Sequence, residues 1–160
     1  MMNEERSIIL DRYLKNIDTL YNNIRSWLSP YGSFIIQEEI EITEEVSGTY
    51  KANKLIIKDD KKEVVASIMP VGAWVIGANG RVDLIGKLDK VIIVNLEKDG
   101  TLLSTSVQAG DYQEAVTRQF YKGIDISGWY WIEDKRRGKA HLLDKELFFE
   151  LISEVSDYEF

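Results

Sequence analysis

The fold is set by residues 81–96, which read RVDLIGKLDKVIIVNL. Two runs rich in Val, Ile and Leu flank the turn-forming segment 86–90, so this stretch predicts an antiparallel hairpin of two strands, 81–86 and 91–96. The run 91–94 is apolar on both of its faces. A strand of this kind needs a neighbour on each edge and cover on each face, so we expect it near the centre of a sheet.

Strand signals continue on both sides of this hairpin. Short runs rich in Ile, Val, Thr and aromatic residues alternate with turn-forming residues, and they predict seven strands. Because the connections are short, successive strands should pair as antiparallel neighbours in a curved meander. Asn79-Gly80 is the strongest turn signal, since both central positions of a type I′ turn need a positive φ. The predicted strands span 34–44, 49–58, 63–69, 73–78, 81–86, 91–96 and 101–107.

The N-terminal segment has helical periodicity. Residues 3–28 carry apolar side chains at alternating steps of three and four, which predicts one long amphipathic helix. Pro30 and Gly32 are expected to end it. Its apolar stripe suits packing on the protein's own sheet, and it also suits a short seam between two copies of the chain, so a homodimer through this helix stays open.

Two shorter helices are predicted after the strands. A capping-box pattern introduces one over residues 111–121, and Asp144 is placed to cap a last amphipathic helix. Between them, residues 124–132 return to strand character. We therefore expect an α+β fold with seven to eight mainly antiparallel strands, in a single domain that covers residues 1–160.

Composition excludes several kinds of site. The chain of 160 residues contains no Cys and a single His, His141. Thiol catalysis, Cys-ligated zinc and disulfides are therefore excluded, and only one imidazole is present to serve as a general base. No glycine-rich segment opens a helix in the way that phosphate-binding loops do, so we expect no nucleotide cofactor and no metal.

The charge balance bears on partners and location. Asp and Glu number 27 against 20 Lys and Arg, which gives a net charge of −7. An acidic chain is repelled by phosphate backbones and anionic lipid surfaces, so nucleic acid and membrane partners are not expected. We see neither a secretory signal nor a membrane-spanning run, and we expect a soluble cytoplasmic protein.

Two segments are candidates for binding a partner. Glu39 and Glu41 share one face of the first predicted strand, where they either stand in solvent or form an acidic surface for a basic partner. Trp129 and Trp131 should lie on the face of their strand opposite to Tyr130. They precede the basic segment 135–139, in which Arg136 and Arg137 lie, and aromatic and cationic groups together suit cation–π contacts or an anionic ligand.

Residues 80–98 resemble the metal-binding hairpin of restriction-endonuclease-like nucleases. In that family an Asp on one strand and an acid-x-Lys pair on the next hold a divalent ion over the scissile phosphate. Here Asp83 matches the first acid, while Asn95 stands in place of the second acid and Glu97 in place of the Lys. The resemblance implies a divalent-metal-dependent nuclease in which these three side chains converge.

The sequence favours a different function. With one His, no Cys and no complete catalytic pattern, we expect a small non-enzymatic binding or interaction module that recognises a protein partner. An inhibitor, an immunity-type protein or an accessory protein would fit this description. The metal-dependent nuclease stays as the alternative.

Overall fold

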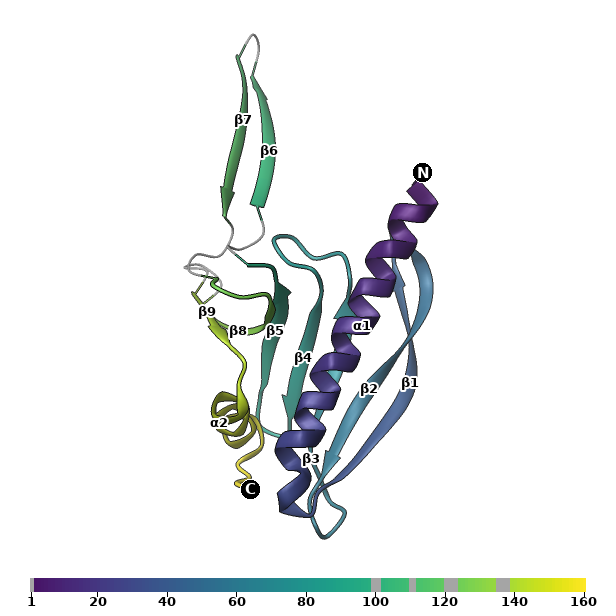
Figure 1. Cartoon of the computed structure of the whole chain (residues 1–160), viewed down its shortest axis with the longest axis vertical. Coiled ribbons are helices and arrows are strands. Elements are labelled where there is room, and N and C mark those ends of the chain that lie inside the picture. The colour runs from purple at the N-terminus through teal and green to yellow at the C-terminus, as the bar shows by residue number, and fades with distance from the viewer. Residues whose placement is uncertain (1, 99–101, 110–111, 120–123, 135–138) are drawn as a thin grey trace.

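A long N-terminal helix and a C-terminal helix pack on a seven-stranded antiparallel sheet (Figure 1). The computed structural model describes residues 2–98, 102–109, 112–119, 124–134 and 139–160. Within these ranges the helices are α1 (Met2–Leu28) and α2 (Lys145–Ser156), with a 3-10 turn at Ser29–Tyr31. The strands are β1 (Phe34–Glu44), β2 (Gly48–Lys58), β3 (Val64–Gly72), β4 (Arg81–Gly86), β5 (Lys90–Leu96), β6 (Leu102–Ala109), β7 (Tyr112–Gln119), β8 (Gly128–Asp134) and β9 (Lys139–Leu142).

The sheet is an antiparallel meander that is interrupted once, by a separate hairpin. Its strand order is β1-β2-β3-β4-β5-β8-β9, and every neighbouring pair is antiparallel. Between β5 and β8 the chain forms the separate hairpin β6–β7, which extends away from the sheet (Figure 1). The predicted α+β class is confirmed, and so is the antiparallel meander from β1 to β5. The predicted pairing of strand 101–107 with strand 91–96 is wrong, because β6 pairs with β7 and β8 occupies that edge of β5.

Both helices cover the same face of the sheet. The predicted stripe of α1 is buried against strand residues such as Leu55, Leu84 and Ile93, and α2 adds Phe148 and Ile152 to the same cluster. None of the described helices is long and apolar enough to cross a membrane. The buried stripe of α1 consists of Tyr13, Ile17, Leu20, Tyr21, Ile24 and Leu28.

A second, smaller core lies on the opposite face of β5 and β8. It contains Val94, Leu96, Ile124, Tyr130 and Ile132, all buried. Since Ile93 and Val94 belong to different cores, β5 is covered on both faces. The expectation drawn from the apolar run 91–94 is confirmed.

The predicted strand 73–78 is wrong. β3 continues to Gly72 and pairs directly with β4, while the residues between them form a loop with a single isolated bridge. The Glu44 carboxylate accepts the backbone N–H groups of Ala73 (3.0 Å) and Trp74 (3.2 Å), so these groups are not part of a strand ladder.

Asn79-Gly80 does not form the predicted type I′ turn. Asn79 lacks a positive φ; its backbone N–H donates to the carbonyl oxygen of Asn95, and the N–H of Asn95 donates to the carbonyl oxygen of Gly80. These two bonds continue the pairing between β4 and β5 beyond Arg81. The ladder with β5 therefore overrides the local preference of the dipeptide for a turn.

The predicted helix 111–121 is also wrong, and the described chain has two α-helices instead of three. Residues 112–119 form β7, paired along its whole length with β6. The sequence of β7, YQEAVTRQ, contains the β-branched and aromatic residues that favour strands. The helix prediction also depended on the helical spacing of Tyr112, Val116 and Phe120, and three apolar residues were too few to outweigh the strand preference and the pairing with β6. Residues 111 and 120–121 lie outside the described ranges.

Candidate interaction groove

Side chains of β8 alternate between the two faces of the sheet, as the sequence predicts. Trp129 and Trp131 pack with the helix-side core, and Tyr130 is buried in the core on the other face. Trp129 is only 6% exposed, and its indole N–H donates to the carbonyl oxygen of Asn16 at 2.9 Å. The Trp131 ring lies tilted beside the ring of His141, with 5.4 Å between centroids. Arg136 and Arg137, the predicted basic partners of these rings, lie outside the described residues.

Trp131 and His141 line a surface groove beside β9, the short strand at one edge of the sheet. We call it the acidic groove; its volume is about 720 Å³. Its walls come from β8, β9, α2 and the segment before β8. The lining residues are Asp125, Ile126, Tyr130, Trp131, Glu133, Ala140, His141, Leu142, Asp144, Glu146, Leu147 and Glu150.

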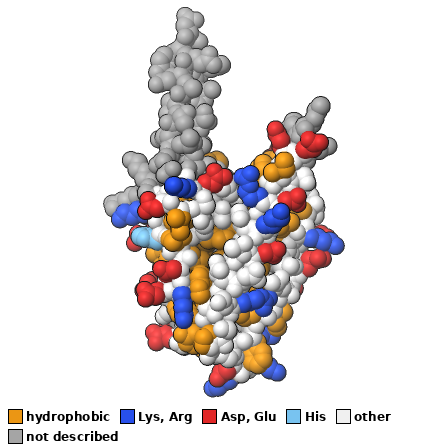
Figure 2. All heavy atoms as spheres, viewed as in Figure 1, with side chains coloured by type: hydrophobic (Ala, Val, Ile, Leu, Met, Phe, Trp, Pro, Cys, Tyr) orange, Lys and Arg blue, Asp and Glu red, His pale blue; other side chains and the backbone are white. Residues whose placement is uncertain are grey.

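Five carboxylates line this groove, and its described lining contains neither Lys nor Arg. Glu133 Oε2 lies 2.8 Å from His141 Nε2. Asp144 caps α2 as predicted, because its carboxylate accepts the backbone N–H of Leu147 at 2.8 Å. Glu146 and Glu150 are four residues apart on α2 and so share one side of that helix. Figure 2 shows several red side chains on this flank of the molecule near the pale blue histidine, with a blue side chain also beside it.

Apolar groups are exposed in the same groove. Ile126 is 52% exposed and Leu142 is 40% exposed, while Trp131 and Leu147 are half-buried. Burial raises the pKa of the Tyr130 phenol, whose hydroxyl donates to the carbonyl oxygen of Ile126 at 2.7 Å. At neutral pH this tyrosine therefore remains an uncharged part of the groove. The groove thus combines negative charge with exposed apolar surface, which suits cations carried on apolar stems.

The acidic strand face predicted from the sequence lies far from this groove, at the other edge of the sheet. Glu39 and Glu41 lie on β1, and both are exposed. A lysine of β2 accompanies these carboxylates: Lys51 lies 3.4 Å from Glu39 and is the register partner of Glu41. On the opposite face of the same strand pair, Lys54 lies 4.0 Å from Glu38. The face therefore carries both signs of charge, unlike the groove.

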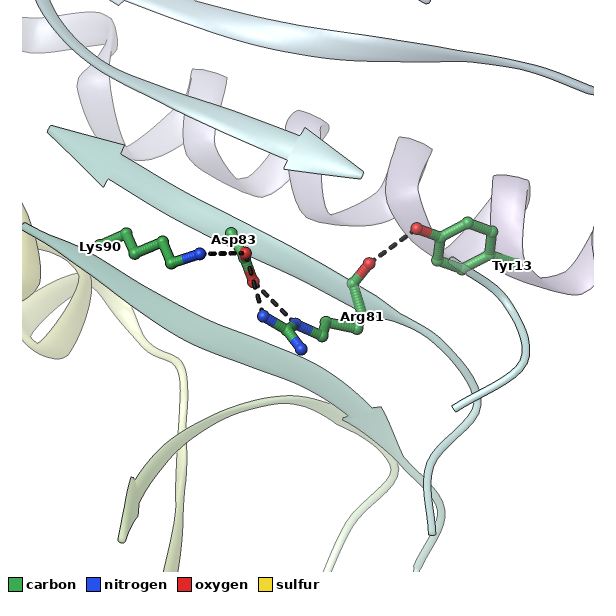
Figure 3. Close-up of polar contacts among 4 residues, drawn as sticks. All are labelled: Tyr13, Arg81, Asp83 and Lys90. Atoms are coloured by element: carbon green, nitrogen blue, oxygen red, sulfur yellow. Dashed lines mark hydrogen bonds and ion pairs between the residues drawn. The ribbon is translucent and has the colours of Figure 1, made fainter. Parts of the chain in front are cut away.

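The nuclease-like trio does not converge. Asp83 is 5% exposed and accepts Arg81 Nε at 2.8 Å and Nη2 at 3.1 Å, with Lys90 Nζ at 3.9 Å (Figure 3). The register pairs Asp83 with Ile92, so it lies on the face of the sheet opposite to Asn95. Asn95 faces α1, where its Oδ1 accepts Asn16 Nδ2 at 3.3 Å.

The third member of the trio, Glu97, lies 3.5 Å from Arg12 of α1. Asp83 is thus held by basic residues of β4 and β5, and the metal site implied by the resemblance is not formed. No group of three or more His, Asp or Glu side chains suited to a metal ion occurs in the part of the chain that the structure describes.

Sequence reasoning missed the acidic groove because its carboxylates come from separate segments. Asp125, Glu133 and the acids of α2 are brought together only by the pairing of β8 with β9 and by the packing of α2. The one local signal was the acidic first turn of α2, which any helix N-terminus tends to carry.

Comparisons of the chain with protein-family models, with curated proteins and with solved structures gave no match.

Proposed function

We propose that this protein is a non-enzymatic interaction module whose acidic groove binds a basic segment of a protein partner. The observation that supports the proposal best is the charge of the groove: five carboxylates and no Lys or Arg in its described lining. The net charge of −7 acts in the same direction, because it attracts a basic partner from a distance and speeds association. Inhibitor, immunity-type and accessory proteins act through binding of this kind.

The mixed lining favours Lys and Arg side chains over simple cations. Their aliphatic stems would pack on Trp131, Leu142 and Leu147, while their charged ends reach the carboxylates of Glu146 and Glu150. An Arg would add bidentate hydrogen bonds to a carboxylate and cation–π contact with the indole ring. A basic peptide is therefore the natural probe.

The proposal is tested by calorimetric titration with a synthetic peptide of about ten residues rich in Lys and Arg, and with an acidic peptide of equal length. The basic peptide should bind, and its affinity should fall as salt shortens the range of electrostatic attraction. The double variant Glu146→Lys/Glu150→Lys should abolish the binding. Both side chains are exposed, so the fold should tolerate the change.

A matched control separates the groove from net charge. The double variant Glu154→Lys/Glu159→Lys makes the same change in net charge at exposed positions that do not line the groove. It should retain most of the affinity. Equal weakening in the two double variants would show that only total charge matters, and absence of binding to the original protein would likewise overturn the proposal.

A further inference from the structure

A second cavity separates α1 from the start of β8. This α1–β8 cleft has a volume of about 370 Å³, within the range of small-molecule sites. α1 contributes Asn16, Thr19 and Asn23, one helical turn apart. β5 contributes Asn95, and the opposite wall includes Ser127 and Trp129.

The polar groups of the cleft have hydrogen-bonding capacity that the fold does not use. Asn16 Nδ2 donates to Asn95 Oδ1 at 3.3 Å. The other amide atoms, Asn16 Oδ1 and Asn95 Nδ2, have no partner among the described residues. The Asn23 side chain makes no hydrogen bond within the described part of the chain. Asn95 is only 7% exposed, but its free Nδ2 is not among the fully buried unpaired atoms of the described chain, so it reaches the cleft, where a ligand can take the place of water on it.

Two indole rings supply the apolar part of the cleft. Trp129 is 6% exposed and its N–H donates to the carbonyl oxygen of Asn16, so only a small carbon edge of this ring borders the cleft. Trp27 lies at the other end on α1, where its ring is tilted against Phe148 with 5.6 Å between centroids. Trp27 is half-buried, so its ring presents the larger flat apolar surface next to the amides.

No charged side chain belongs to the described lining of the cleft. Figure 2 shows mostly white and orange surface between α1 and the α2 side of the molecule. A charged ligand would lose its hydration here without an opposite charge in return. Amides and hydroxyls, by contrast, both donate and accept, and so match a ligand whose groups also do both.

We propose that the α1–β8 cleft binds a neutral, hydroxyl-rich small molecule of the saccharide class. Its hydroxyls pair with the unused amide atoms of Asn16, Asn23 and Asn95, and its carbon-bound hydrogens pack on Trp27. Ile126 and Leu142 border both this cleft and the acidic groove, but the amides belong to the cleft alone. The inference is independent of the proposed protein partner.

The test is saturation-transfer NMR on the full chain with glucose, galactose and N-acetylglucosamine at about 10 mM, beside glucuronate and uridine. At least one neutral sugar should bind, and glucuronate should not. Asn23→Ala should weaken that binding about tenfold, the effect of one lost hydrogen bond. Asn22→Ala, at the adjacent exposed position outside the cleft, should leave it unchanged.

Three results would overturn the inference. They are absence of binding by all neutral sugars, binding of uridine or glucuronate alone, and equal affinity in the Asn22 and Asn23 variants. Because Asn23 is exposed and unpartnered in the described chain, its replacement should not unfold the protein, which circular dichroism would verify. The variant Glu146→Lys/Glu150→Lys should still bind the sugar, so failure of the groove proposal and failure of this one are distinguishable.

Discussion

Gly80→Ala should destabilise the protein strongly, because Gly80 lies directly against the ring of Tyr13. Its φ is +137°, which side chains rarely adopt, and an added Cβ would lie 2.2 Å from Tyr13 Cδ1. The ring is fully buried, and its hydroxyl donates to the carbonyl oxygen of Arg81 at 2.7 Å (Figure 3). It therefore has no room to move aside without losing that bond.

The magnitude follows from two contributions. Backbone strain at such a φ costs about 1–3 kcal/mol, and forcing a packed ring out of place costs about 1–3 kcal/mol more. We expect the free energy of unfolding to fall by about 2–6 kcal/mol, a large share of the roughly 5–15 kcal/mol typical of a domain. Urea unfolding followed by circular dichroism measures this quantity, provided that the slope with denaturant is unchanged.

Gly48→Ala is the matched control. Gly48 also has a positive φ, +75°, but nothing lies within 4 Å of an added Cβ. This variant should lose only the backbone contribution, about 1–2 kcal/mol. If Gly80→Ala lost no more stability than Gly48→Ala, the claim that the Tyr13 ring is fixed against Gly80 would be refuted.

Two further predictions concern buried polar groups. Asp83→Ala should lower the free energy of unfolding by about 1–3 kcal/mol, because it removes the partner of Arg81. Glu39→Ala, at an exposed ion pair, should change the free energy of unfolding by less than about 0.5 kcal/mol. Thermal unfolding compares the two variants, and equal effects would contradict the burial argument. Burial raises the pKa values of the Tyr13, Tyr21 and Tyr50 phenols well above the ordinary value of about 10. Since these folded-state pKa values exceed the unfolded ones, the contribution to stability is fully present below pH 10 and is lost as pH rises toward the folded pKa values. Absorbance at about 295 nm should show three phenols that ionise only when circular dichroism reports unfolding, and early ionisation of all eight tyrosines would refute this.

Hydrophobic periodicity correctly predicted the helices and strands in which apolar side chains recur regularly over the whole element. The spacing of Tyr13, Ile17 and Ile24 is satisfied by burial on the sheet, and the apolar run 91–94 is satisfied by two cores. In both cases the pattern repeats over enough residues to outweigh local preferences. Asp144 was also identified correctly, since a helix cap depends only on residues within one turn.

The errors arose where distant residues supply the hydrogen bonds. No local rule places the Glu44 carboxylate on the N–H groups of Ala73 and Trp74, or Asn95 opposite Asn79 and Gly80. Likewise, Asp83 and Asn95 share a hairpin, but the register sends them to opposite faces. The acidic groove and the α1–β8 cleft are assembled from segments far apart along the chain, so their composition is visible only after folding.

The placement of β8 beside β5 has a consequence for folding order and for sequence change. Leu96 and Gly128 are register partners, yet roughly thirty residues separate them, whereas the hairpins from β1 to β5 close over short turns. The β1–β5 meander should therefore assemble first, and the addition of β8 and β9 should come later. Because the entropy of closing a long loop grows by only about 0.6 kcal/mol for each doubling of its length, a longer β6–β7 hairpin should cost little stability, whereas loss of Ile124 would remove a side chain from the second core.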